Sequence, residues 1–312
     1  MTPQTMQPSR PDWFDDELYP YESRFVAVEG ARIHYIDEGE GPVLLMAHGN
    51  PSWSFLYRHL VRGLRGRFRV IAWDHPGFGL SRAPAGYGYR PEDHARVAAG
   101  LIEALDLRDI TLMIQDWGGP IGLGAALAHP DRMRALIVGN TWFWPVEGDR
   151  SAERFSKLLG GPLGRFLNLR FNFFPRALMP LLMKKNRPKG RVKRMYTAPF
   201  PTPESRYPVA ILPKEILGSS RFLRGLESNI PVLSELPVLI VWPTKDLAFQ
   251  QRHRERWQRT FPNHETVILD GVGHFIQEEA PERVTTAILD WWDGRKPDNQ
   301  PFAKRTEVPD EH

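Results

Sequence analysis

The chain has 312 residues, of which 41% are hydrophobic, 11% aromatic and 25% charged, proportions typical of a globular protein with one large or two modest domains. It contains no cysteine, which excludes a disulfide framework, a thiolate metal site and a cysteine nucleophile. The 41 Lys and Arg residues barely outnumber the 37 Asp and Glu residues, so the net charge does not indicate a nucleic-acid partner.

The sequence also gives no indication of membrane insertion or export. Apolar runs such as 43–47 and 236–242 are far shorter than the roughly 18 residues that span a bilayer. Residues 1–20 are acidic and lack an apolar segment of the kind found in signal peptides. We therefore expect a cytoplasmic protein without a membrane partner.

Short apolar runs alternate with helical patterns in the first part of the chain. Strands are predicted at 32–37, 43–48, 69–74, 110–115 and 135–139, and helices at 53–64, 90–105 and 120–128. Strands that alternate with helices favour crossover connections and a mostly parallel sheet. The fold class predicted from this pattern is therefore α/β.

The pattern changes at residue 142, where proline and aromatic residues become frequent and no clear strand follows. Residues 142–231 are interpreted as a helical insertion, with helices at 166–182 and 209–217. Within it, residues 184–194 hold seven basic residues in eleven, which we interpret as a solvated face, the alternative being attraction of anions.

The alternating pattern then returns, so the insertion divides a discontinuous core. Strands are predicted at 236–242 and 264–269, helices at 249–260 and 281–292, and a loose polar tail at 294–312. The predicted domains are a core of residues 1–141 and 232–312 and a helical cap of residues 142–231.

Polar residues follow several of the predicted strands, and in an open α/β sheet ligands bind beyond the carboxyl ends of the strands. Asp116 lies between an apolar strand and Gly118-Gly119-Pro120, which opens a helix. This is the strand–turn–helix setting of a nucleophile elbow, with aspartate in place of serine. The residue two places before it is Ile114 rather than a small residue, so the elbow needs its room from Gly118 and Gly119.

Two further residues complete a candidate triad. His274 follows the last predicted strand, and Asp246 follows the strand before it. The chain order Asp116, Asp246, His274 is the order of nucleophile, acid and base in hydrolases with this sheet. Asn140 occupies a second position where an acid could stand, but an amide cannot serve as one.

The motifs around these residues resemble those of haloalkane dehalogenases, over roughly residues 25–292 and more loosely in the cap. They are His48-Gly49-Asn50-Pro51, Asp74-His75-Pro76-Gly77-Phe78-Gly79, Gln115-Asp116-Trp117-Gly118-Gly119 and Gly273-His274-Phe275. The resemblance implies an α/β-hydrolase fold with a cap. It is to the branch whose acid lies at Asp246 and whose halide-stabilising pair is Asn50 and Trp117.

The resemblance implies hydrolysis of a haloalkane to a primary alcohol and a halide through an ester on Asp116. The expected partners are a small halogenated hydrocarbon, water and the halide product, with no cofactor and no metal. Five aromatic residues near these loops are candidates for the pocket wall: Trp53, Phe143, Trp144, Phe249 and Phe275. The aromatic, proline-rich cap also permits self-association.

Other functions are compatible with parts of the pattern. An epoxide hydrolase shares the aspartate nucleophile and histidine base and needs cap tyrosines, for which Tyr196 and Tyr207 are candidates. A luciferase of this fold is compatible with the same motifs. A fluoroacetate-type dehalogenase would need arginines after Asp116, and a non-catalytic scaffold would not need the triad.

Overall fold

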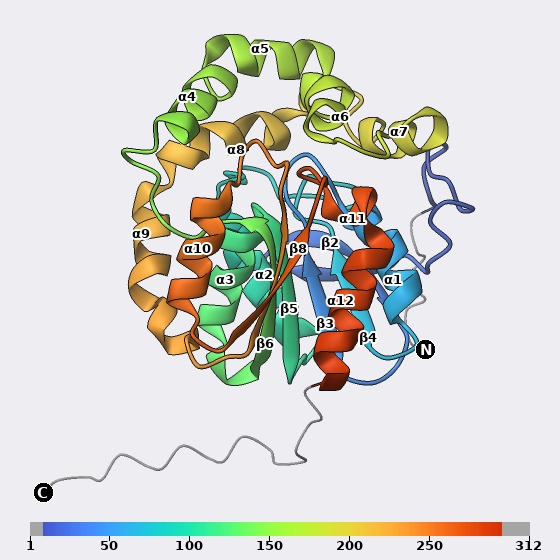
Figure 1. Ribbon diagram of the computed structural model, residues 1–312. Helices are drawn as coiled ribbons and strands as arrows, with labels where there is room; N and C mark the ends of the chain where they lie inside the picture. The colour runs from blue at the N-terminus through green and yellow to red at the C-terminus, as the bar shows by residue number, and fades with distance from the viewer. Residues whose placement is uncertain (1–8, 295–312) are drawn as a thin grey trace, which may run out of the picture.

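A central eight-stranded sheet organises the computed structural model, which describes residues 9–294. The strand order is β1-β2-β4-β3-β5-β6-β7-β8, and only β2 runs against its neighbours (Figure 1). The strands are β1 (Arg24–Val28), β2 (Ala31–Glu38), β3 (Val43–Ala47), β4 (Arg69–Trp73), β5 (Ile110–Asp116), β6 (Met133–Thr141), β7 (Val238–Pro243) and β8 (His264–Leu269). The predicted mostly parallel α/β sheet is confirmed.

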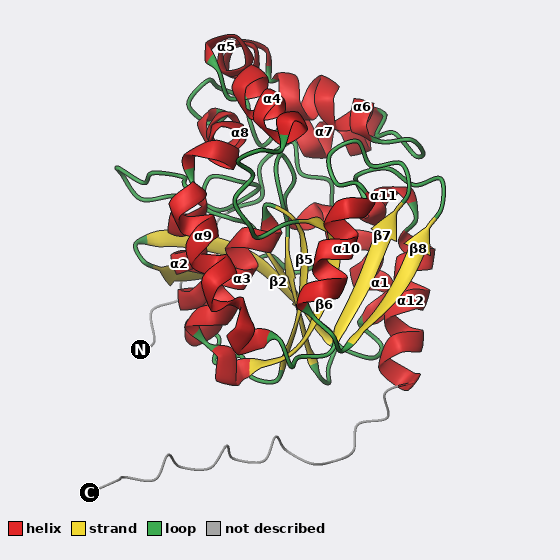
Figure 2. Ribbon diagram, turned by 60° about the vertical axis from the view of Figure 1, so that its left-hand side comes forward, coloured by secondary structure: helices red, strands yellow, loops and turns green. Residues whose placement is uncertain are grey.

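The central strands are buried on both faces, which explains why they read as continuous apolar runs. Helices α1 (Arg58–Leu64) and α12 (Pro281–Gly294) pack together on one face of the sheet. Helices α2 (Pro91–Ala104), α3 (Gly118–Ala128) and α10 (Gln251–Thr260) cover the other (Figure 2). The short helix α11 (Ile276–Glu279) precedes α12.

Between β6 and β7 the described chain forms helices and no strand. Above the carboxyl ends of the strands lie α4 (Arg150–Leu159), α5 (Pro162–Phe171), α6 (Met179–Leu182), α7 (Gly190–Thr197) and α8 (Tyr207–Gly218). Helix α9 (Ser220–Asn229) instead packs against α3 beside the sheet. The stretch expected as a cap therefore includes one helix of the core layer.

Several expected elements differ from the structure. The helix expected at 166–182 is broken at Asn172, whose φ of +56° lies in the left-handed region and whose side chain donates to Thr197 and Phe200 carbonyls. The helix expected at 53–64 begins as a 3₁₀ turn, Ser54–Tyr57. Strand β1 and helices α4, α7 and α9 were not predicted, and most of the expected tail lies outside the described residues.

The described helices are all too short or too polar to cross a bilayer.

Candidate active site

Asp116 ends β5 on a sharp turn into α3. Its φ of +51° is unusual for a residue with a side chain and is held by the surrounding contacts. A Cβ atom on Gly118 would lie 2.1 Å from the Ala47 carbonyl oxygen, and one on Gly119 would lie 1.8 Å from Thr141 Oγ1. The two glycines therefore provide the room for the elbow, as the sequence predicts.

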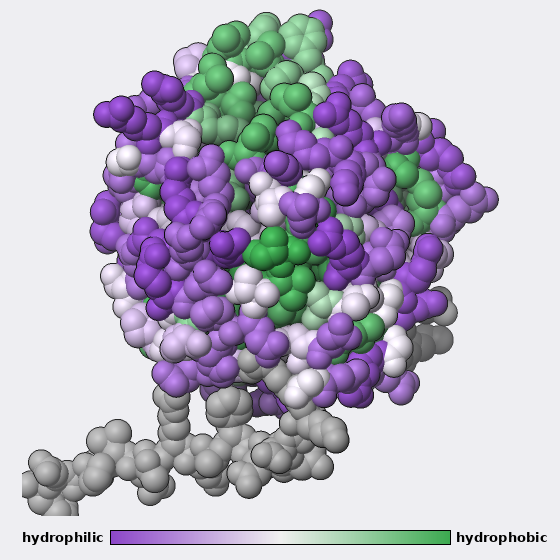
Figure 3. Space-filling view, in the orientation of Figure 1, coloured by the Kyte–Doolittle hydropathy of each residue, from purple (hydrophilic) through white to green (hydrophobic). Residues whose placement is uncertain are grey.

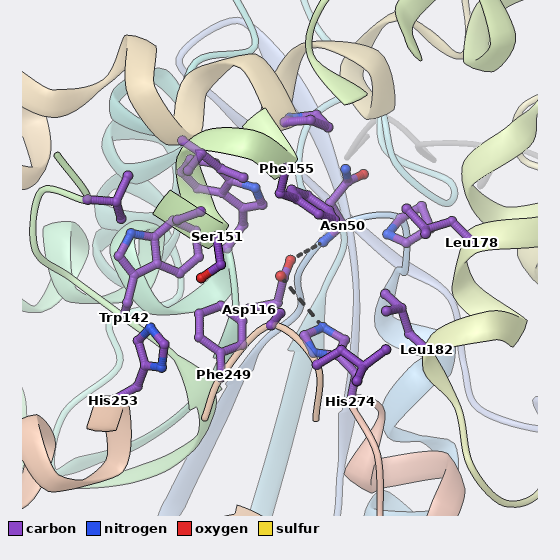
Figure 4. A pocket seen from close by; sticks show the side chains of 18 of the residues that line it. Asn50, Asp116, Trp142, Ser151, Phe155, Leu178, Leu182, Phe249, His253 and His274 are labelled. Atoms are coloured by element: carbon purple, nitrogen blue, oxygen red, sulfur yellow. Dashed lines mark hydrogen bonds and ion pairs between the residues drawn. The ribbon is translucent and has the colours of Figure 1, made fainter. Parts of the chain in front are cut away.

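The Asp116 carboxylate is held by one backbone donor and faces one side-chain base (Figure 4). Its Oδ1 accepts a hydrogen bond of 2.7 Å from the Asn50 backbone N–H. Its Oδ2 lies 3.6 Å from His274 Nε2. A Cβ atom on Gly49 would lie 2.3 Å from Oδ1, so only glycine lets the carboxylate approach this loop. One carboxylate oxygen is thus fixed, while the other faces the histidine.

His274 is oriented by Asp246. The ring Nδ1 lies 2.8 Å from Asp246 Oδ2, and both side chains are buried. Asp246 also accepts from Asn140 Nδ2 and from the Ala248 N–H. Burial acts to raise the pKa of Asp246, but the His274 charge and these hydrogen bonds bring it below its usual range. Asn140 is therefore a hydrogen-bond partner of Asp246.

Two carboxylates determine the protonation of His274. Burial acts to lower the pKa of His274, but Asp246 and Asp116 together raise it to about 10. Both carboxylates therefore favour the imidazolium form of the ring.

The loop that carries His274 is tied to the cap through a buried carboxylate. Glu279 Oε2 accepts from the backbone N–H groups of Gly273, Lys184 and Lys185 at 2.8–3.0 Å. The His274 N–H donates to the Leu182 carbonyl at 3.3 Å. The position of the base thus depends on the cap segment that follows α6.

A cavity of about 140 Å³ opens over Asp116, between the strand ends and the cap. Sixteen of its 21 lining residues are apolar, and the polar ones are Asn50, Asp116, Ser151, His253 and His274. Such a wall suits a small apolar ligand positioned by a few polar groups.

Asn50 and Trp117 both line this cavity beside Asp116. The Trp117 ring packs edge-on against Trp142, with centroids 4.7 Å apart. The Asn50 Nδ2 group donates one hydrogen bond of 3.2 Å to the Val209 carbonyl of α8. An amide NH₂ carries two hydrogens, so a second donor remains. Within residues 9–294 there is no group of three or more side chains suited to a metal ion.

Comparisons with known proteins identify the family of the chain. Residues 42–281 match the family model described as alpha/beta hydrolase fold. Haloalkane dehalogenase 2 of Mycobacterium tuberculosis is 43% identical over 278 residues, covering 88% of this chain and 96% of that protein. The chain belongs to the haloalkane dehalogenase family.

Two further similar proteins are a solved dehalogenase structure and a relative with another activity. The crystal structure of haloalkane dehalogenase DatA from Agrobacterium tumefaciens superposes with a TM-score of 0.79 at 29% identity, covering 88% of this chain and 96% of that chain. A cis-3-alkyl-4-alkyloxetan-2-one decarboxylase of Shewanella oneidensis is 30% identical, covering 88% of this chain and 89% of that protein. The family model and the dehalogenase relatives show that this chain has the α/β-hydrolase fold and is an enzyme that acts on carbon–halide bonds.

Of the five aromatic residues expected in the dehalogenase pocket, Trp144 and Phe249 line the cavity, and Phe249 stacks on His274 with centroids 5.8 Å apart. The other three expectations were wrong because each ring has partners elsewhere. The Trp53 indole donates to the Met195 carbonyl. Phe143 packs on Trp257, and Phe275 packs edge-on against the His274 ring without lining the cavity.

Other lining residues were missed by the sequence reasoning. Trp142 packs between Trp117 and Phe249, and its place directly after β6 was the available signal. Gln115 does not line the cavity, but its Nε2 lies 3.1 Å from His274 Nε2 and donates to the His274 carbonyl. The cap also contributes Ser151, Ala152 and Phe155 from α4, a helix that the sequence did not predict.

The cap tyrosines that an epoxide hydrolase would need do not line the cavity. Tyr196 is buried, and its hydroxyl bonds Glu278 beside Arg58. Tyr207 is partly exposed and packs against Tyr89.

Proposed function

We propose that this enzyme hydrolyses haloalkanes to a primary alcohol and halide through a covalent alkyl ester on Asp116. The proposal rests on the different surroundings of the two Asp116 carboxylate oxygens. Oδ1 is held by the Asn50 N–H at 2.7 Å, and Oδ2 faces His274 at the base of an apolar cavity. An ionised carboxylate in this position is a nucleophile without help from a base.

In the first step Asp116 Oδ2 forms a bond to the halogen-bearing carbon, and the carbon–halogen bonding pair leaves with the halide. The leaving anion needs hydrogen-bond donors rather than a proton. We assign that role to Trp117 and to the second N–H of the Asn50 amide, because both residues line the cavity with Asp116. Each such donor in a dry site lowers the activation barrier by about 3–4 kcal/mol.

In the second step water attacks the ester carbonyl carbon and passes a proton to His274. Asp116 Oδ1, already held by the Asn50 N–H, becomes the oxyanion, and collapse of the tetrahedral intermediate releases the alcohol with a proton from His274. Formation of the ester removes the Asp116 charge, which is one of the causes of the raised pKa of His274. Alkylation therefore removes one cause of the raised pKa and favours release of a proton from the imidazolium to solvent, which leaves the neutral imidazole that accepts the proton of the attacking water.

Gln115 suits both protonation states of the base. Its amide lies within hydrogen-bond distance of His274 Nε2. The amide oxygen can accept from an imidazolium N–H, and the amide N–H can donate to a neutral Nε2. We propose Gln115 as the residue that orients His274 on the side opposite Asp246.

The alternative, an epoxide hydrolase with the same nucleophile and base, has less support. It requires a hydroxyl donor on the cap, and neither Tyr196 nor Tyr207 lines the cavity. The oxetanone decarboxylase relative is distinguished by the product, because only a haloalkane releases halide.

The test removes the base and counts halide. With 1-bromobutane, His274→Phe should release about one bromide per active site and then stall. Intact-mass analysis should show an added butyl group, which peptide mapping should place on Asp116. The matched control, Asp116→Ala, should give neither bromide nor adduct. Absence of both signals in His274→Phe, in a folded protein, would mean that the covalent mechanism is wrong.

A further inference from the structure

The positive charge of the protein is concentrated on one part of the cap. We define the cap crest as residues 150–194, which include α4 to α7. It holds 13 Lys and Arg residues and one acidic residue, Glu153, whereas the rest of the chain has 28 Lys and Arg against 36 Asp and Glu. The net charge of the whole chain is small because a strongly basic crest is offset by an excess of acidic residues in the rest of the chain.

Helix α5 in the crest buries small and polar residues and exposes large apolar ones. The residues that it buries against its neighbours are Gly164 and Asn168, whose amide bonds Arg206 and Phe174 backbone groups. Its large apolar side chains Leu163 and Phe166 face outward and are 62% and 56% exposed. A surface helix normally does the opposite.

The exposed apolar surface extends beyond α5. Leu158 on α4, Phe171 at the end of α5 and Leu181 on α6 are also more than half exposed. Five of the nine large hydrophobic side chains that stand exposed in residues 9–294 thus belong to the crest. Figure 3 shows hydrophobic side chains gathered over the top of the molecule, where Figure 1 places α4 and α5.

Several arginine side chains of the cap crest form no ion pair with another described residue. In the described part of the chain, Arg154, Arg170 and Arg176 form no ion pair with an acidic side chain. Arg170 and Arg176 moreover lie close enough to Arg206 to disfavour its charge. These positive side chains lack an anionic partner within the described residues.

We propose that the cap crest docks on the surface of an anionic lipid bilayer. Leucine and phenylalanine side chains that alternate with arginine and lysine match acyl chains and anionic headgroups at the same time. A second copy of the chain docked crest to crest would bring two basic surfaces together. A nucleic acid would satisfy the cations but leave Leu158, Leu163 and Leu181 without an apolar partner.

The position of the crest gives this docking a consequence for the enzyme. Phe155 and Leu182 line the cavity, and Leu158 and Leu181 stand exposed on the same two helices. Haloalkanes partition into bilayers because they are apolar. A docked crest would place the cavity wall beside dissolved substrate, an extension that rests on the proposed function, whereas docking itself does not.

Vesicle flotation of the full-length protein tests the proposal. Vesicles of phosphatidylcholine mixed with phosphatidylglycerol should bind the protein, vesicles of phosphatidylcholine alone should bind it poorly, and added salt should weaken binding. The variants L163S/F166S and R154Q/R170Q should each bind the anionic vesicles at least about tenfold more weakly. The exposed controls Val232→Ser and Arg259→Gln should bind as the parent does.

Bromide release from a water-soluble haloalkane without vesicles should be unchanged in all four variants, which shows that they fold. The proposal is overturned if the parent does not bind anionic vesicles, or if the crest variants and the controls bind equally. It is also overturned if sedimentation shows that the crest variants dissociate an oligomer of the parent, since the crest would then contact a second copy.

Discussion

Replacing Asp246 by asparagine should separate the two halves of the proposed reaction. Three donors converge on the Asp246 carboxylate: His274 Nδ1–H at 2.8 Å, the Asn140 amide and the Ala248 N–H. An asparagine offers one acceptor atom and one NH₂ group to these donors, so at least one donor meets an N–H. The negative charge that holds up the pKa of His274 is lost as well.

The expected effect on steady-state turnover is a decrease of about 10³- to 10⁴-fold, or about 4–5.5 kcal/mol in the barrier. The displacement step does not use His274, so stopped-flow measurement of bromide should still show a burst near one per active site. Adding Asn140→Asp replaces one of the competing donors with a carboxylate and should restore part of the turnover. A single variant Asp246→Asn whose turnover stays within about tenfold of the parent would refute the assignment of the acid.

Three further outcomes are expected. Chloride or bromide should quench the fluorescence of Trp117 saturably, and Trp117→Phe should remove that signal; a titration unchanged by the substitution would place the halide elsewhere. Glu279→Gln should weaken the hold on the His274 loop and lower turnover about 10- to 100-fold while leaving the halide burst, whereas the exposed control Glu282→Gln should match the parent in both measurements. Burial lowers the pKa of His48 to about 4 and of His94 to about 3, so below about pH 6.5 the unfolded chain takes up protons that the folded protein does not. As the pH is lowered from about 6.5 to about 4, these two groups should lower the free energy of unfolding by about 3 kcal/mol per pH unit, which denaturant titrations can measure. A free energy of unfolding that does not change with pH in this range would contradict the assignment of neutral, buried rings.

The order of the catalytic side chains could be predicted because it depends on local features. Asp116 is the last residue of β5, and Asp246 and His274 follow β7 and β8 within a few residues. Parallel strands bring their carboxyl ends to the same edge, so residues distant in sequence become neighbours. Gly118 and Gly119 could be predicted from their place directly after Asp116, but the atoms that exclude a Cβ there belong to other strands, the Ala47 carbonyl of β3 and Thr141 of β6.

The wall of the cavity could be decided only by the tertiary structure. Trp53 and Trp144 are both aromatic residues near the active-site loops, but Trp53 is held by the Met195 carbonyl and Trp144 lines the cavity. Hydrophobicity predicts that a side chain is buried, and the packing of the cap against the strand ends determines which space it borders.

The exposed face of helix α5 likewise could not be predicted from the sequence. Its apolar residues would indicate a face packed on the core, but the left-handed turn at Asn172 and the burial of Gly164 and Asn168 turn that face outward. Most strands of the sheet, and the positions of Asp116, Asp246 and His274 at its carboxyl edge, could thus be predicted, because they follow from residues adjacent in the chain. The cavity wall and the exposed crest depend on how separate helices pack, and that information is absent from any single segment.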